Sequence, residues 1–242
     1  MSDAPGEHEP TRRVVVAWTR TISAEYVSCA LTQQLGHWLT LIGASPDLIR
    51  AAWAIAEDEL VHAELATEVV LAAGATPAPV LAREAMVHPR VGDEPLEQSV
   101  ARACMGSFCI GETSAVPLFG AMREGSGVPV VRGFFDRVLR DEVRHRDFGW
   151  LLLDWLLATR HADAVREVIA RDLPARYRAH YRGYVPAVAR ERALTAAEVA
   201  WGLLPDEGYA RVLDRCAQRD LVPRFAERGI VLDVEEALRG GE

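Results

Sequence analysis

One five-residue pattern occurs twice in this chain, at residues 58–62 (Asp-Glu-Leu-Val-His) and at residues 141–145 (Asp-Glu-Val-Arg-His). Both copies read Asp-Glu-x-x-His, and both lie in segments whose apolar residues recur at helical spacing. Residues three apart on a helix share a face, so the Glu and the His of each copy can reach one point. Two such copies predict two helices that each present a carboxylate and an imidazole to a shared site.

The surrounding sequence predicts four long helices, over residues 14–42, 46–73, 95–123 and 130–159. Stretches that contain Gly and Pro separate them. Short turns join the first two helices and the last two, whereas the long stretch 75–94 connects the two pairs. This order of hairpin, crossover and hairpin predicts an all-α protein built on an antiparallel four-helix bundle.

The remaining sequence differs on the two sides of this predicted bundle. Residues 1–13 are polar and are expected to form a disordered tail. The bundle itself would occupy residues 14–160. Residues 161–242 are expected to form a C-terminal helical extension packed on the bundle, with shorter helices over 162–184, 196–203, 206–218 and 221–228.

Two isolated glutamates add to the repeated pattern. Glu25 is the only acidic residue in segment 14–42, and Glu112 is the only one between Glu97 and Glu124. The residues three and four positions from Glu112 are apolar or small, so its carboxylate would lie on an apolar face. A charged carboxylate there needs a compensating partner or must take up a proton.

A pair of metal ions would supply that compensation. In each predicted hairpin, the lone Glu of the first helix and the Glu-x-x-His of the second lie at similar distances from the turn, and therefore at similar heights. Four carboxylates would balance two divalent cations. The predicted catalytic and metal-binding residues are Glu25, Glu59, His62, Glu112, Glu142 and His145.

This set resembles the ligand set of the ferritin-like di-iron carboxylate superfamily, in which one Glu from each of two helices joins a Glu-x-x-His from each of the other two. Residues 141–145 also look like the Asp-Glu-x-Arg-His motif of its oxygen-activating branch. The resemblance implies that Asp58 and Asp141 accept the histidine N–H of the opposite helix, and that Arg144 steadies one of these aspartates. Val61 stands where the second copy has Arg144, so that network is expected to be lopsided.

The length of the chain and its added helices are similar to those of aldehyde-deformylating oxygenases. The resemblance implies a non-haem di-iron oxygenase or oxidase with two iron ions, or manganese in their place. Its substrates would be dioxygen and a small, largely apolar organic molecule of specialised metabolism. The reaction would be a hydroxylation, N-oxygenation, desaturation or aldehyde deformylation. A ferredoxin or another reductase would donate electrons. The oligomeric state stays open, with a homodimer as one option.

Composition excludes several other classes of function. The formal net charge of -8 argues against nucleic acid as a ligand, because phosphate binding needs a basic surface. The chain contains no lysine, which excludes Schiff-base chemistry. Its four cysteines form no Cys-x-x-Cys pair and are expected to be reduced and buried. With no signal peptide and no membrane-spanning run, a soluble cytoplasmic protein is expected.

Several interpretations remain open at this point. An iron-storage protein without an organic substrate, or a helical interaction module stabilised by metals, would carry the same ligands. His37 is a weak candidate for a seventh ligand. Pro117 could deform its helix beside the metals and open a substrate path, or it could be an ordinary kink. His180 lies in an Arg-rich stretch that could be a surface stripe or a docking patch for an acidic redox partner.

Overall fold

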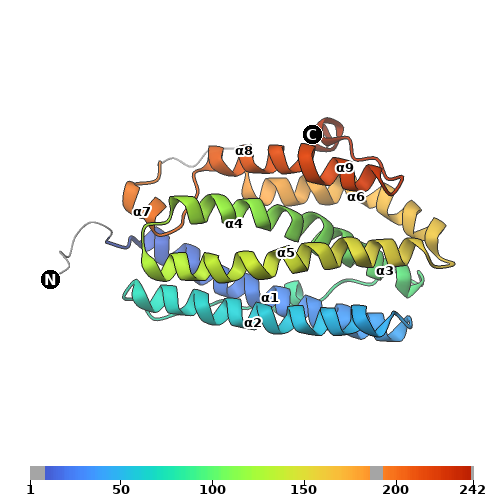
Figure 1. The fold of residues 1–242 in the computed structure, drawn as a ribbon, viewed down its shortest axis with the longest axis horizontal. Coiled ribbons are helices and arrows are strands. Elements are labelled where there is room, and N and C mark those ends of the chain that lie inside the picture. The colour runs from blue at the N-terminus through green and yellow to red at the C-terminus, as the bar shows by residue number, and fades with distance from the viewer. Residues whose placement is uncertain (1–8, 186–192, 241–242) are drawn as a thin grey trace.

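The computed structural model describes residues 9–185 and 193–240, and within these ranges the protein is all-helical and has no strand. Helices α1 (Arg12–Leu41) and α2 (Pro46–Ala72) run antiparallel, side by side (Figure 1). Thr11 caps α1, which therefore begins two residues before the predicted start; residues 1–8 of the predicted tail lie outside the described residues. Ser45 caps α2, and Pro46 occupies its first turn, as the sequence predicts.

The third predicted helix is not one continuous α-helix, and that prediction is wrong. It consists of α3 (Leu96–Ala103), a π-helix η2 (Cys104–Glu112) and α4 (Thr113–Gly125). The π-helix lies against α5 (Pro129–Leu157) where α5 carries Gly149. A Cβ atom at Gly149 would lie 2.5 Å from the Cβ of Phe108, so only glycine allows this approach. The buried thiols of Cys104 and Cys109 donate to the Gly149 carbonyl, at 3.2 and 3.6 Å.

Pro117 lies inside α4, one turn after the π-helix. A proline lacks the N–H that would bond the carbonyl four residues earlier, here that of Thr113. The thiol of Cys216 donates to this carbonyl at 3.4 Å. Helix α4 therefore continues through Pro117 with its freed carbonyl satisfied, and the irregular helix nearest to Glu112 is η2.

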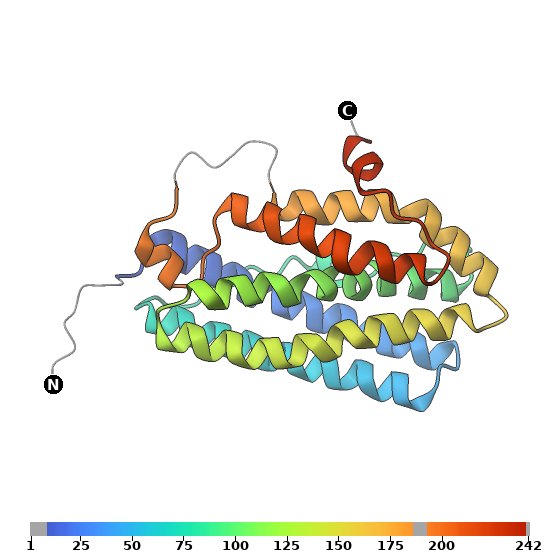
Figure 2. The same cartoon turned by 45° about the horizontal axis from the view of Figure 1, so that its top comes forward.

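The later helices pack on the first four segments (Figure 2). Helix α6 (Ala162–Tyr184) covers α3 and η2, and α8 (Asp206–Cys216) covers α4. The short helix α7 (Ala196–Ala200) is followed by Trp201, whose carbonyl accepts the indole N–H of Trp18 at 2.8 Å. The other elements are η1 (Arg83–Met86), η3 (Ala217–Leu221), α9 (Val222–Ala226) and α10 (Val234–Arg239), of which α10 was not predicted.

Two apolar clusters leave a polar layer between them. On α1, Ile22 belongs to one cluster and Leu35 to the other; on α5, Val138 and Phe148 divide in the same way. The predicted ligands lie in the intervals, so apolar side chains cover the layer at both of its ends. None of the described helices has the length and hydropathy needed to cross a membrane.

Candidate metal centre

Four helical segments direct the predicted ligands into the polar layer. Helix α1 contributes Glu25, and η2 contributes Glu112 as its last residue. Helices α2 and α5 each contribute one Glu and one His, namely Glu59, His62, Glu142 and His145. Both histidines are fully buried, and three of the glutamates are buried while Glu112 keeps some exposed surface. The structure thus brings together all six residues that the sequence singled out.

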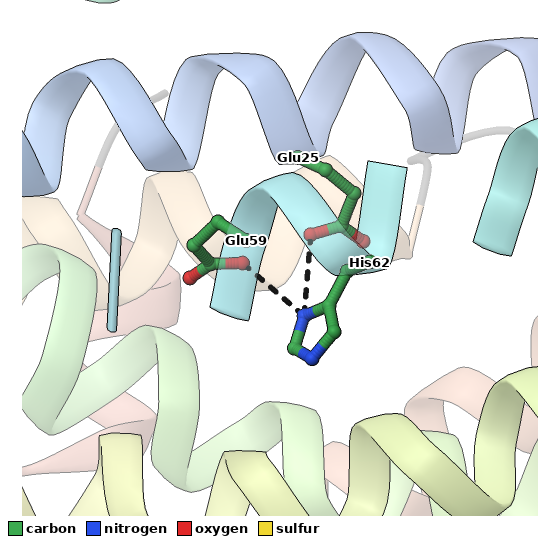
Figure 3. A group of neighbouring side chains, drawn as sticks. All are labelled: Glu25, Glu59 and His62. Carbon is green, nitrogen blue, oxygen red and sulfur yellow. Dashed lines mark ion pairs between the residues drawn. The ribbon is translucent and has the colours of Figure 1, made fainter. Parts of the chain in front are cut away.

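These side chains form two overlapping groups. The ligand atoms of Glu25, Glu59 and His62 lie within 4.8 Å of one another, and so do those of Glu59, Glu112 and His145. Figure 3 shows Glu25 and Glu59 converging on Nδ1 of His62, at 3.8 and 3.4 Å. Glu59 belongs to both groups, so its carboxylate connects them.

Glu142 spans the same two groups from α5. One of its carboxylate oxygens lies 3.9 Å from Nδ1 of His62, and the other lies 3.7 Å from Nδ1 of His145. Glu59 has the same relation to both imidazoles, with its second oxygen 3.7 Å from Nδ1 of His145. Two carboxylates therefore reach between the two imidazoles, and Glu25 and Glu112 lie at the outer ends.

Unsatisfied polar atoms test whether this arrangement suits a metal. Nδ1 of His62 and Nδ1 of His145 are buried without a hydrogen-bond partner among the described residues, as is Oε2 of Glu142. Buried polar atoms without partners are rare in native proteins. These atoms all face the same space, and imidazole nitrogens with carboxylate oxygens suit iron and manganese. The residues can therefore hold a metal ion, and their donor atoms fit one.

The pKa shifts of the glutamates reflect burial and repulsion between neighbouring carboxylates. Burial, followed by the charge of Glu59, raises the pKa of Glu25 well above its usual range. Burial and the charge of Glu142 do the same to the pKa of Glu112. Burial also opposes ionisation of Glu59, but the imidazole of His62, 3.4 Å away, and the charges of the two imidazoles outweigh burial and lower the pKa of Glu59. Cations bound here would favour the ionised form of these carboxylates.

The second ring nitrogen of each histidine, Nε2, contacts an aspartate of the opposite motif. Nε2 of His62 lies 3.2 Å from Asp141, and Nε2 of His145 lies 3.2 Å from Asp58. Burial opposes protonation of His145, but its contacts with Asp58 and Glu142 raise its pKa to about 10. Each aspartate thus fixes an imidazole with Nδ1 turned toward the carboxylates, as second-layer acceptors commonly do in metal sites.

Two arginines complete this outer layer, and the sequence reasoning found only one of them. Arg144 bonds both Asp58 and Asp141. Arg137 also bonds both, at 3.2 Å and 2.6 Å respectively. Both arginines come from α5 and neither from α2, where Val61 stands, so the network is lopsided as expected, although both aspartates are paired. The signal for Arg137 in the sequence was the position four residues before Asp141, which places both on one helix face.

Two further residues clarify the limits of the site. Ser28, three residues after Glu25, donates to Glu59 at 2.8 Å and was not singled out from the sequence. His37 is exposed on α1 and belongs to neither of the two groups found in the described part of the chain.

Comparison with known proteins adds no family to this description. No protein-family model matches the chain, and no curated protein matches it. What is shown is thus an all-helical protein with a buried group of glutamates and histidines that could bind a metal.

Proposed function

We propose that this chain is a ferritin-like di-iron oxygenase, built on an antiparallel four-helix bundle with a C-terminal helical extension. The observation that carries the proposal is the pair of overlapping carboxylate–imidazole groups that share Glu59. The bundle would consist of α1, α2, the α3–η2–α4 segment and α5. Helices in such bundles build metal sites from facing side chains, with a Glu-x-x-His on two of them.

Charge favours two divalent ions over one. Four glutamates with two neutral imidazoles carry a charge that two divalent cations would cancel, which suits a buried site. Iron bound here would supply the electrons and open coordination positions for reduction of dioxygen coupled to oxidation of an organic substrate. Manganese is the alternative metal, and a ferredoxin or another reductase is the proposed source of further electrons.

The protein's own contribution is positioning and exclusion of water. Glu59 and Glu142 would set the spacing of the two ions, because each reaches toward both imidazoles. Asp58 and Asp141 would keep Nδ1 of each histidine free for coordination by holding Nε2. The apolar clusters on both sides would shield the layer from solvent.

Metal analysis with an oxygen-uptake assay tests this function. We expect two irons per chain after anaerobic incubation with ferrous salt, and oxygen uptake that depends on an organic substrate. Glu59→Ala should lose metal, because Glu59 belongs to both groups. Glu64→Ala, at an exposed position of the same helix, is the matched control and should keep it.

Other outcomes would favour other functions. Many irons per chain would support the alternative of an iron-storage protein. Two metals without oxygen uptake would support a helical module that its metals only stabilise. If Glu59→Ala binds as much iron as Glu64→Ala, this group of residues is not the metal site.

A further inference from the structure

A second polar cavity lies outside the metal centre, beneath helix α6. It has a volume of about 340 Å³, is partly open to solvent, and is lined by α1, the segment around η1, α3, η2 and α6. Among its lining residues Arg176 is exposed. Its polar lining includes Ser99, Arg102, Arg176, His88 and His180, and its lining contains no acidic residue. Volumes of this size suit a small organic ligand. His180, which the sequence left as a surface stripe or a docking patch, is half-buried in this wall.

Four buried polar atoms in this wall have no hydrogen-bond partner among the described residues. They are Ser99 Oγ, Arg102 Nη1, His88 Nε2 and His180 Nε2. Ser99 and Arg102 are themselves more than nine-tenths buried. Native proteins leave few such atoms unsatisfied, and here four of them surround one cavity. The wall therefore offers several hydrogen-bond donors to whatever occupies it.

The charges around the cavity leave one positive charge without a counterion. Arg102 pairs with Glu94 and Asp172, at 2.6 and 2.7 Å, and both acids also pair with Arg171. These four residues are therefore balanced. Arg176 forms no ion pair within the described part of the chain, and its charge acts on His88. One uncompensated charge suits a ligand with a single negative charge.

Contacts within the protein fix the position of His88 in the cavity wall. The side chain of Gln34 accepts the backbone N–H of His88 at 2.7 Å and donates to its carbonyl at 3.3 Å. The ring of His88 also contacts the ring of Trp38, with centroids 5.7 Å apart. A preformed wall reduces the entropy lost on binding.

One element connects the cavity with the candidate metal centre. Gly106 and Ser107 line the cavity from η2, the same π-helix that ends in Glu112. On α6, the ring of His180 contacts the ring of Tyr184, with centroids 5.3 Å apart.

We propose that this cavity binds the carboxylate group of a small organic acid through Arg176, Arg102 and Ser99. If the proposed function holds, on which this second step rests, organic acids are the substrate class of the metal centre. The carboxylate would lie beneath α6, and the rest of the molecule would extend along η2 toward Glu112.

Calorimetric titration of the full, iron-loaded chain under anaerobic conditions tests the cavity. The probes are octanoate and its neutral analogue octanamide. We expect octanoate to bind at least about tenfold more tightly, as one charge-assisted hydrogen bond predicts. Arg176→Gln should lose that preference, and Arg176→Lys should keep most of it. Arg166→Gln, which removes an exposed arginine from the same helix, should bind like the wild type.

The contrary results are equally distinct. Equal affinity for octanoate and octanamide, or unchanged octanoate binding by Arg176→Gln, would overturn the carboxylate site. So would inorganic phosphate that binds at the same place more tightly than octanoate. These binding results do not depend on turnover, so they stand even if the proposed oxygenase function fails.

Oxygen uptake with a panel of linear and aromatic carboxylic acids tests the second step. We expect uptake with some of these acids and a raised KM in Arg176→Gln, with kcat largely kept. Uptake that depends on neutral substrates alone, while octanoate still binds through Arg176, would overturn the assignment of substrate class and leave the carboxylate site in place.

Discussion

At the scale of single residues, Glu112 and His145 belong to the group that lies farther from Glu25. We expect Glu112→Ala and His145→Ala each to lose at least one metal per chain, because each removes a donor that no neighbour replaces. Elemental analysis of the purified variants measures this, and circular dichroism checks the fold. Glu124→Ala, at an exposed position in α4, serves as the control. Full metal content in both variants would remove these two residues from the site.

Asp141 acts on the metal centre only through His62 and the arginines. We expect Asp141→Ala to weaken metal binding by about 10- to 100-fold, the usual effect of losing the acceptor behind a ligating imidazole. Competition with a chelator of known affinity measures the change. Asp136→Ala removes an exposed aspartate from the same helix and should leave the affinity as it is. Equal affinities for these two variants would contradict the role of Asp141.

His180, which lines the cavity beneath α6, should affect how the stability of the protein depends on pH. Burial lowers the pKa of His180 to about 4, from about 6.5 in the unfolded chain. The unfolded state therefore binds more protons between these values, so stability is lost as the pH falls through this window. We expect His180→Gln to lose less stability than the wild type there, by on the order of 1–3 kcal/mol.

Urea denaturation between about pH 7 and pH 4 measures this difference. His37→Gln, which removes an exposed imidazole of α1, is the control. Parallel stability curves for the wild type and His180→Gln would show that His180 does not stay neutral in the folded protein.

At the scale of elements, the contact between η2 and α5 determines where Glu112 is placed. We expect Gly149→Ala to destabilise the protein by about 2–4 kcal/mol, because the added methyl group would collide with Phe108. The variant should also lose metal affinity if η2 shifts. Gly133→Ala, at an exposed position in the same helix with open space around it, should be neutral or stabilising by up to about 1 kcal/mol. Thermal and urea denaturation compare the two.

Local signals in the sequence were sufficient for most helices but not for their irregular parts. Ser45 and Pro46 mark the start of α2. The spacing of Glu and His on one helix face does not depend on tertiary structure. The π-helix depends on a neighbour far along the chain, since Gly149 is what allows Phe108 to approach. Helix α10 has its own cap, Asp233, but it is too short for periodicity to show.

The same distinction applies to the candidate site. Its six proposed ligands were found because four of them belong to a repeated motif and the two lone glutamates lie in otherwise non-acidic segments. Arg137 was missed because an arginine four residues from an aspartate is common on any helix surface. Only the approach of α2 to α5, which brings Asp58 near, shows that it serves both aspartates.

At the scale of the whole molecule, the metal centre weakens the metal-free protein. Burial and neighbouring carboxylates raise the pKa of Glu112, so the folded state binds more protons than the unfolded state. The stability contributed by this group therefore falls as the pH rises. We expect Glu112→Gln to stabilise the metal-free protein at neutral pH, by on the order of 1–3 kcal/mol, while it abolishes the stabilisation that iron gives the wild type.

Thermal melting with and without ferrous iron measures both effects. The wild type should melt higher with iron, and Glu112→Gln should melt at one temperature in both conditions. A variant that is less stable than the metal-free wild type would contradict the idea that repulsion among these carboxylates opposes folding.

Each histidine of the polar layer contacts an aspartate from the other half of the chain. His62 contacts Asp141, and His145 contacts Asp58. Neither half alone therefore contains the complete set of residues that orients both histidines. If the chain is cleaved within residues 75–94, neither fragment alone should bind iron. Iron binding should return only when the two fragments reassociate. If the proposed metal centre forms, metal binding should therefore follow the docking of the two halves and report that they have docked in register.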